Sequence, residues 1–261
     1  MILSWETISD IISKKWSKVD SINEKYQVQD MSFTNHFKAI LPHIVNNDNP
    51  FTNGEYTLYS LLSKYFTTIL DVGVRDDIYY IEKSEPGTKI YLFEPNPIFF
   101  KKLSDNVNNY SGSTTRNINL INAGCSDRES VLQYYKTAES FVNRFNEVPH
   151  MELPVVRLDA LPEIQKETAI DFLKVDTEGF EIDVLRGCEG IFSKIRLIQF
   201  EYGGTYPDRN ILLKDVVELL KTHGFSFFYY IFSDGLITLD SEEVIEHKQY
   251  SNILVSKFSF T

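Results

Sequence analysis

The chain has 261 residues, a length that fits one large domain or two small ones and can bury a large core without disulfides or a structural metal. It carries 26 Lys and Arg against 37 Asp and Glu, a net charge of −11, with 43% hydrophobic residues. This acidic globular composition argues against nucleic acid or an anionic membrane surface as the main partner, because both are bound through clusters of Lys and Arg.

The first part of the chain, residues 1–52, predicts a helical extension. Ser4 can cap a helix that carries Trp5 and Trp16 at helical spacing, and a second helix is expected just before Pro42. The segment has neither the basic start nor the apolar run of a signal peptide, and no apolar stretch is long enough to span a bilayer. We therefore expect a cytoplasmic protein that does not enter a membrane.

The two cysteines, Cys125 and Cys188, agree with that location. Neither has a partner at zinc-binding spacing, and two are too few for a disulfide scaffold. We expect both thiols to be free, as is usual in a reducing compartment.

The remaining residues, 53–261, predict a single α/β domain. Short, nearly continuous apolar runs alternate with helical patterns, which is typical of a parallel sheet covered on both faces. We expect strands over 67–72, 89–93, 119–122, 170–175 and 197–201, extra strands over 130–135 and 154–158, and a closing pair over 225–232 and 252–258. Helices are expected over 55–66, 97–107, 180–191 and 210–223.

The ends of the five main strands are unusually acidic. Open parallel sheets bind their ligands at the carboxyl ends of the strands. A single acid there often caps the next helix, but several gathered together repel each other and are typical of a site that binds a cation or hydroxyl groups. The acids at these strand ends are Asp71, Glu94, Asp176 and Glu201.

The first two of these acids have the spacing of a nucleoside-binding site. Glu94 follows Asp71 by 23 residues, the spacing at which an acid after the second strand accepts hydrogen bonds from a ribose diol. The turn after the first strand reads GVRDD and lacks the GxGxxG pattern that a pyrophosphate needs. Its two acids would repel a pyrophosphate, whereas S-adenosylmethionine has no phosphate and carries a positive sulfonium. This favours S-adenosylmethionine over a nicotinamide cofactor.

Several motifs, in order and at matching distances, resemble the FkbM-type methyltransferases, a branch of the class I methyltransferases that use S-adenosylmethionine. The resemblance covers about residues 53–257, and the stretch over 170–187 together with FEPNP carries most of its weight. The motifs are ILDVG at 69–73, YLFEPNP at 91–97, NAGCSD at 122–127, VVRLDAL at 155–161, IDFLKVDTEGFEIDVLRG at 170–187, IQFEYGG at 198–204, HGF at 223–225 and YSNILVSK at 250–257.

The resemblance implies a Rossmann-like sheet of seven mostly parallel strands with helices on both faces. It also implies methyl transfer to a hydroxyl, commonly on a sugar, a glycan or a natural product. Carried over by position, Asp71 and Gly73 would shape the methionine end of the cofactor site, and Glu94 would hold the ribose diol with Asn96 beside it. Asn122 and Ala123 would border the adenine, and Asp176 and Glu201 would face the methyl-transfer centre.

The turn after the first strand departs from the family pattern. It reads DVGVRDD where DVGANxG is usual, so Arg75 replaces an Asn and Asp77 replaces the second Gly. One outcome is that Arg75 pairs with the carboxylate of the cofactor. The alternative is a weakened or non-catalytic nucleotide-binding module.

Methyl transfer to oxygen requires alignment of the acceptor and removal of its proton. Asp176 and Glu201 are the candidates for the base, and Lys174 would lower the pKa of the acceptor or pair with one of them. His150 would compete only if the loop over 137–150, where we expect the acceptor to bind, folds over the site. Asp176 with Glu178 could bind a divalent cation through oxygen ligands, but the DTEG segment lacks the ligands of a calcium loop, so we favour a site without a metal. The sequence does not specify the oligomeric state.

Overall fold

The structure is a computed structural model that describes residues 17–19, 47–203, 205–233, 235–244, 246–247 and 249–259. The chain divides into two compact units. The central unit is Ser63–Phe200, and the second unit combines Met1–Leu62 with Glu201–Thr261. The helices expected before residue 47 lie outside the described residues, and a domain boundary at residue 52 stays a prediction.

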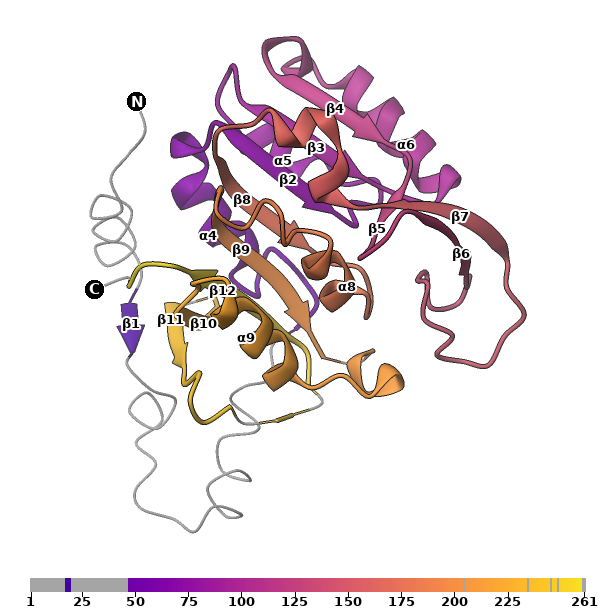
Figure 1. Ribbon diagram of the computed structural model, residues 1–261. Coiled ribbons are helices and arrows are strands. Elements are labelled where there is room, and N and C mark those ends of the chain that lie inside the picture. The colour runs from indigo at the N-terminus through magenta and orange to yellow at the C-terminus, as the bar shows by residue number, and fades with distance from the viewer. Residues whose placement is uncertain are drawn as a thin grey trace. The chain divides into compact units, whose positions relative to one another are not determined.

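The central unit is built on parallel strands, as the sequence predicts (Figure 1). Every neighbouring pair in this part of the sheet is parallel, and all five residues of β2 are buried. Strands so enclosed read as continuous apolar runs, which explains why β3 and β8 have the bounds expected from the sequence. In the order β9-β8-β2-β3-β4 the strands are β9 (Ile195–Tyr202), β8 (Ile170–Val175), β2 (Thr68–Val72), β3 (Lys89–Phe93) and β4 (Asn117–Ile121).

Helical segments cover both faces of these strands. Ile90 and Leu92 of β3 belong to one buried cluster with Ile81 and Leu103 from two helices, α5 and α6. Tyr91, which points to the opposite face because side chains alternate along a strand, reaches Glu167 just after α7. The helices are α5 (Tyr79–Lys83), α6 (Pro97–Asn109), α7 (Pro162–Gln165) and α8 (Glu181–Arg186), with 3₁₀ turns η1 (Ser63–Tyr65), η2 (Ser113–Thr115) and η3 (Leu158–Ala160).

Helix α8 is shorter than expected, ending at Arg186 rather than near residue 191. Gly187 follows it, and a Cβ atom there would lie 2.2 Å from the carbonyl oxygen of Ser126. The chain therefore passes so close to a neighbouring segment at this point that only glycine fits, and it continues in turns.

A small sheet of three strands carries the long loop of the central unit. β6 and β7 form an antiparallel hairpin, and β5 pairs with β7 in parallel. The two strands of the hairpin were expected, whereas β5 is too short for a sequence pattern. The strands are β5 (Gly124–Cys125), β6 (Ser130–Tyr134) and β7 (Met151–Val156), and the connection over 135–150 is here called the β6–β7 loop.

The second unit has its own strands and helices. β10 is antiparallel to both β11 and β12, and β1 is parallel to β11, giving the order β1-β11-β10-β12. The pair β10 and β12 confirms the expected closing strands, and the aromatic run of β10 is buried as predicted, but β11 was not expected. The elements are β1 (Ser17–Val19), α4 (Glu55–Leu62), η4 (Tyr206–Arg209), α9 (Leu213–Thr222), β10 (Phe227–Phe232), β11 (Gly235–Leu239) and β12 (Ser251–Ser256).

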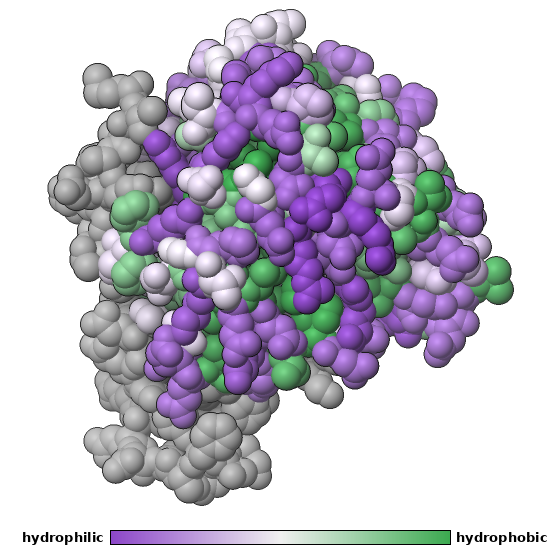
Figure 2. All heavy atoms as spheres, viewed as in Figure 1, coloured by the Kyte–Doolittle hydropathy of each residue, from purple (hydrophilic) through white to green (hydrophobic). Residues whose placement is uncertain are grey.

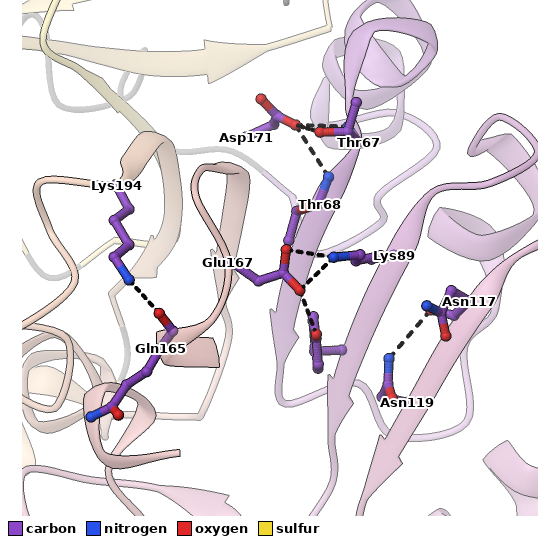
Figure 3. Close-up of polar contacts among 10 residues, drawn as sticks. Thr67, Thr68, Lys89, Asn117, Asn119, Gln165, Glu167, Asp171 and Lys194 are labelled. Carbon is purple, nitrogen blue, oxygen red and sulfur yellow. Dashed lines mark hydrogen bonds and ion pairs between the residues drawn. The ribbon is translucent and has the colours of Figure 1, made fainter. Parts of the chain in front are cut away.

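The parallel strands begin at what we call the amino edge, where buried acids meet donors (Figure 3). Asp171, at the start of β8, is 2% exposed. Its Oδ2 accepts from the backbone of Thr67 and Thr68 at 2.7 and 3.1 Å and from Thr67 Oγ1 at 2.8 Å, while Oδ1 lies 2.8 Å from the Arg196 guanidinium. One carboxylate thus ties together the beginnings of three strands.

A second acid of the amino edge is Glu167. Both of its oxygens lie 2.9 Å from Lys89 Nζ, and the Tyr91 hydroxyl donates to one of them at 2.8 Å. Burial and this carboxylate raise the pKa of Tyr91 well above its ordinary value, so its proton stays in place.

Hydrophilic side chains dominate the coloured part of the face in Figure 2, with only small hydrophobic patches between them. Within the residues that the structure describes, no helix has the length and apolar character needed to cross a membrane.

Candidate functional site

The site candidates lie at the carboxyl edge, where the same parallel strands end. Two turns leave this edge side by side: the 73–77 turn after β2 and the 176–179 turn after β8. Because β2 and β8 are neighbours in the sheet, the residues that follow them are brought together although they are far apart in sequence.

Glu94 follows β3 and is only 4% exposed. Its Oε2 accepts a hydrogen bond from the backbone N–H of Arg75 at 2.9 Å, and its Oε1 accepts from that of Asn96 at 2.7 Å. Burial raises the pKa of Glu94 from 4.5 to about 7, although these two hydrogen bonds act in the opposite direction. The carboxylate is therefore fixed in place, and its pKa lies close to neutral pH.

Two asparagines frame Glu94. The side chain of Asn96 caps α6 by accepting from Ile98 N at 2.9 Å, which anchors the segment that follows β3. Asn122, after β4, donates through Nδ2 to the carbonyl oxygens of Glu94 and Pro95 at 2.8 and 3.0 Å. Ala123, the next residue, is buried. The structure thus gathers Glu94, Asn96 and Asn122 around one corner of the edge, with Ala123 beside them.

Gly73 joins the two turns. It has a φ of +88°, and a Cβ atom there would lie 1.6 Å from the carbonyl oxygen of Asp176. The N–H of Gly73 donates to Phe93 O at 3.0 Å, and the N–H of Asp176 donates to Val72 O at 2.9 Å. Glycine is required here both for its backbone conformation and for this contact.

Arg75, the first unusual residue of the 73–77 turn, is also left-handed, with a φ of +56°. Its guanidinium lies 2.9 Å from Glu139 Oε2 and 4.6 Å from the centre of the Phe99 ring. Pairing of Arg75 with a cofactor carboxylate stays a prediction. In the structure, the Arg75 guanidinium forms an ion pair with the Glu139 carboxylate.

Asp77, the second unusual residue, has an ordinary role in the backbone. Its Oδ1 accepts from Tyr79 N at 2.8 Å at the start of α5, and it is not one of the described residues with a positive φ. The path of the turn therefore does not need a glycine at position 77. How closely the cofactor approaches the backbone at Asp77 stays a prediction.

Asp71 lies on the same face of the sheet as two candidate catalytic residues, Lys174 and Asp176. Asp71 of β2 is in register with Lys174 of β8 and is 5% exposed. Lys174 Nζ lies 3.2 Å from Asp176 Oδ2, and the side chain of Asp176 keeps 28% of its surface exposed. Asp176 is thus oriented by a cation and still accessible to a substrate.

Glu201, the other expected base, lies in β9 directly after the residues that pair with β8. It is the first residue of the second unit, so its approach to Asp176 stays a prediction. The expectation that no metal is used stays a prediction as well.

The β6–β7 loop folds onto the 176–179 turn, as the acceptor hypothesis requires. Ser140, only 2% exposed, points its Oγ at the carbonyl oxygens of Thr177 and Glu178, at 3.3 and 2.9 Å. Phe141 packs against Phe180 with ring centroids 5.5 Å apart. His150, however, is exposed. Its backbone continues the hairpin through a bond from His150 N to Tyr134 O.

Several residues of the site were not found from the sequence. Glu181 is 1% exposed, and its Oε1 accepts from both turn residues Thr177 and Gly179. Burial raises the pKa of Glu181 to about 7. An acid at the start of a helix is a readable signal for Glu181, but nothing in the sequence links Ser140 or Glu139 to turns so distant along the chain.

Backbone strain is concentrated where these segments meet. Non-glycine residues in the left-handed region are uncommon and cluster at functional sites. Four of the five found among the described residues belong to these segments: Arg75 to the 73–77 turn, Glu139 and Asn146 to the β6–β7 loop, and Glu178 to the 176–179 turn. This independent observation points to the same part of the carboxyl edge.

Several solved structures are similar to the chain at low sequence identity. It is similar to a TehB-like SAM-dependent methyltransferase from Corynebacterium glutamicum (12% identity, 87% of this chain and 96% of that chain, TM-score 0.46). It is also similar to a putative rRNA-methylase from Clostridium thermocellum (9%, 79% and 97%, 0.46) and to precorrin-6y C5,15-methyltransferase from Geobacter metallireducens (12%, 78% and 88%, 0.44). Likeness at this level assigns neither a family nor a substrate.

No curated protein matches the chain. The model of one family does, described as the methyltransferase FkbM domain, over residues 71–227. That match runs from the end of β2 to the beginning of β10 and includes every candidate residue of the site. The chain therefore belongs to the FkbM methyltransferase family, which uses S-adenosylmethionine as its cofactor.

Proposed function

We propose that this methyltransferase transfers the methyl group of S-adenosylmethionine to a hydroxyl of a sugar, a glycan or a related small molecule. The observation that carries the proposal is the contact of the 73–77 turn with the 176–179 turn through Gly73 and Asp176. This contact places an accessible carboxylate next to the segment that would hold the methionine end of the cofactor.

The residues of the carboxyl edge fit the cofactor. Each oxygen of Glu94 accepts one backbone N–H and retains capacity for another donor, and a ribose diol has two hydroxyls to donate. A buried carboxylate with a raised pKa is stabilised when such donors arrive. Glu94 would hold the ribose, Asp71 and Gly73 would border the methionine end, and Asn122 with Ala123 would border the adenine.

The bound cofactor would supply an activated methyl group. The remaining work is the deprotonation and alignment of the acceptor hydroxyl, which must approach in line with the bond that breaks. Asp176 would accept the proton, and the Lys174 ammonium 3.2 Å away would fix the direction of its carboxylate. The β6–β7 loop would cover the acceptor and exclude water.

A small polar acceptor is favoured over a polyanion. The net charge is −11, and the groups at this edge are mainly carboxylates, which bind hydroxyls but repel phosphates. Vicinal hydroxyls match the two oxygens of a carboxylate, so a sugar is the substrate class that these side chains suit best.

The test combines a transfer assay with a binding assay. Wild-type protein and S-adenosylmethionine are incubated with a panel of free sugars and glycosides, and methylated products are detected by mass spectrometry. Asp176→Asn should lower turnover at least ~100-fold, because it removes the base. The same variant should bind S-adenosylhomocysteine as the wild type does, by calorimetry.

Asp105→Asn is the matched control, since Asp105 is an exposed acid of α6 that pairs with Lys101. It should leave turnover and binding unchanged. Near-normal turnover of Asp176→Asn would remove Asp176 as the base. A wild type that binds S-adenosylhomocysteine but methylates no sugar would favour the non-catalytic nucleotide-binding alternative.

A further inference from the structure

The 176–179 turn has a conformation that its own sequence does not favour. Glu178 has a φ of +55° and Gly179 a φ of +101°, so two consecutive residues are left-handed. A residue with a side chain pays a steric penalty there and stays only when its surroundings hold it. Something outside the turn must therefore fix it.

The side chain of Glu181 accepts hydrogen bonds from backbone N–H groups of the turn. Oε1 of this buried residue accepts from Thr177 N at 2.8 Å, from Thr177 Oγ1 at 3.0 Å and from Gly179 N at 3.2 Å. Three donors on one oxygen make a compact arrangement that forms only if the backbone curls around the carboxylate. Oε2 has no hydrogen-bond partner among the residues described, so Oε1 alone makes these contacts.

The hydroxyl of Ser140 contacts backbone carbonyl groups of the turn. Its Oγ lies 3.3 Å from Thr177 O and 2.9 Å from Glu178 O, and it accepts from Val142 N at 3.1 Å. Ser140 belongs to the β6–β7 loop, 37 residues before Thr177 in the chain. The polar backbone groups of the turn are thus bonded by two side chains from different segments.

We propose that Ser140 and Glu181 are positioning residues, which act together to fix the 176–179 turn and through it the orientation of Asp176. The proposal rests on the proposed function in one respect, the role of Asp176 in methyl transfer. It adds that the β6–β7 loop is a structural support of the catalytic carboxylate in addition to a cover for the acceptor. Removing either side chain should loosen the turn without unfolding the protein.

Hydrogen exchange of the full chain tests this without any acceptor. In Ser140→Ala the amides of Thr177 and Gly179 should exchange about tenfold faster, the effect expected from one lost hydrogen bond. Glu181→Met, which has no acceptor oxygen, should exchange still faster. Glu181→Gln keeps an oxygen at the position of Oε1 and should stay near the wild-type rate.

Thr88→Val is the matched control. Thr88 is also 2% exposed, and its Oγ1 lies 3.3 and 2.8 Å from two carbonyl oxygens, those of Phe66 and Glu85, at the amino edge. It should cost similar stability, read as the melting temperature, and leave exchange at residues 177–179 unchanged. Equal exchange at these residues in Ser140→Ala and the wild type would overturn the proposal.

Turnover provides the second readout, on the sugar that the wild type methylates. Ser140→Ala should lower kcat about tenfold with an unchanged KM for S-adenosylmethionine, because misplacement of a catalytic group acts on the chemical step. Thr88→Val should keep its kcat. Faster exchange with unchanged kcat would overturn the positioning role, whereas faster exchange in a protein that methylates no sugar would count against the proposed function alone.

Discussion

The two edges of the parallel sheet both contain buried carboxylates, but they satisfy them differently. At the amino edge, Asp171 is paired with Arg196 and Glu167 with Lys89. At the carboxyl edge, Glu94 and Glu181 accept backbone N–H groups, and burial raises the pKa of each to about 7. Losing one member of a buried ion pair destabilises a protein, so the acids of the amino edge have a structural role, whereas a carboxylate that titrates near neutrality is available to a ligand or to a neighbouring turn.

The largest effect should come from a pair of glycines, one at each edge. Gly73 and Gly87 have nearly the same φ, +88° and +87°, but a Cβ atom on Gly87 would meet nothing within 4 Å. Gly73→Ala should lower the free energy of unfolding by more than ~4 kcal/mol, because a backbone clash is added to the unfavourable φ. Gly87→Ala should cost only about 1–2 kcal/mol. Denaturant titration measures both, and equal losses would contradict the close contact of the two turns.

At the amino edge, Asp171→Ala should be a purely structural change. It leaves Arg196 partly buried without its carboxylate and frees the donors of Thr67, so the free energy of unfolding should fall by about 3–5 kcal/mol. Folded Asp171→Ala should bind S-adenosylhomocysteine with the wild-type affinity. A specific loss of affinity in the folded variant would show that the two edges are not independent.

At the carboxyl edge, Glu94→Gln should affect cofactor binding, which Asp171→Ala leaves unchanged. Removal of the charge should weaken S-adenosylhomocysteine binding about 10- to 100-fold, the range for hydrogen bonds to a charged group. The free energy of unfolding at neutral pH should fall by about 1–3 kcal/mol, because glutamine offers one acceptor oxygen to the two backbone N–H groups of Arg75 and Asn96. Calorimetry and denaturant titration on the same samples separate the two effects.

The affinity for S-adenosylhomocysteine should depend on pH through the titration of the same carboxylate, that of Glu94. The raised pKa of Glu94 means that the free folded protein holds a proton that the unfolded chain has lost, between about pH 4.5 and 7. The stability contributed by this group is therefore full below pH 4.5 and lost as the pH rises to 7. Ribose hydroxyls favour the ionised form, so affinity for S-adenosylhomocysteine should rise by at most ~tenfold per unit up to pH 7 and then level off. Glu94→Gln should lack this slope.

The smallest effect is expected for Tyr91→Phe at the amino edge. It removes one hydrogen bond to Glu167, while Lys89 still pairs with that carboxylate. We expect a loss of about 1 kcal/mol in the free energy of unfolding and no change in cofactor affinity or turnover. A change in turnover would mean that the amino edge contributes to catalysis.

The sequence predicts the fold well where burial is complete. β3 and β8 have the expected bounds because enclosed parallel strands show as apolar runs bounded by polar residues. Elements of a few residues were missed, such as β5 and α5, since a short segment has no readable period. The end of α8 was misplaced, and the close approach of Gly187 to Ser126 just after it is a tertiary contact that the sequence does not show.

The position of the site candidates was predictable in part. Residues that end strands, such as Glu94 and Asp176, lie at one edge as expected because the topology of a parallel sheet brings strand ends together, while their roles stay predictions. Ser140 was not found, because its role depends on how a long loop folds back onto a turn that comes later in the chain. The charges of the sequence also did not indicate that Arg75 forms an ion pair with Glu139.

The contact of Gly73 with Asp176 also explains how the 73–77 turn can carry such an unusual sequence. The turn is held by main-chain atoms: Gly73 N on Phe93 O, Asp77 N on Val74 O, and the Cα of Gly73 against the carbonyl of Asp176. The side chains of the turn differ in how far they take part: Val74 is buried in the core and Asp77 Oδ1 accepts from Tyr79 N, whereas Asp76 contributes its carbonyl oxygen to a hydrogen bond from Asn106. Position 76, whose described contact is made by a main-chain atom, is accordingly the natural place to re-engineer the charge of this turn.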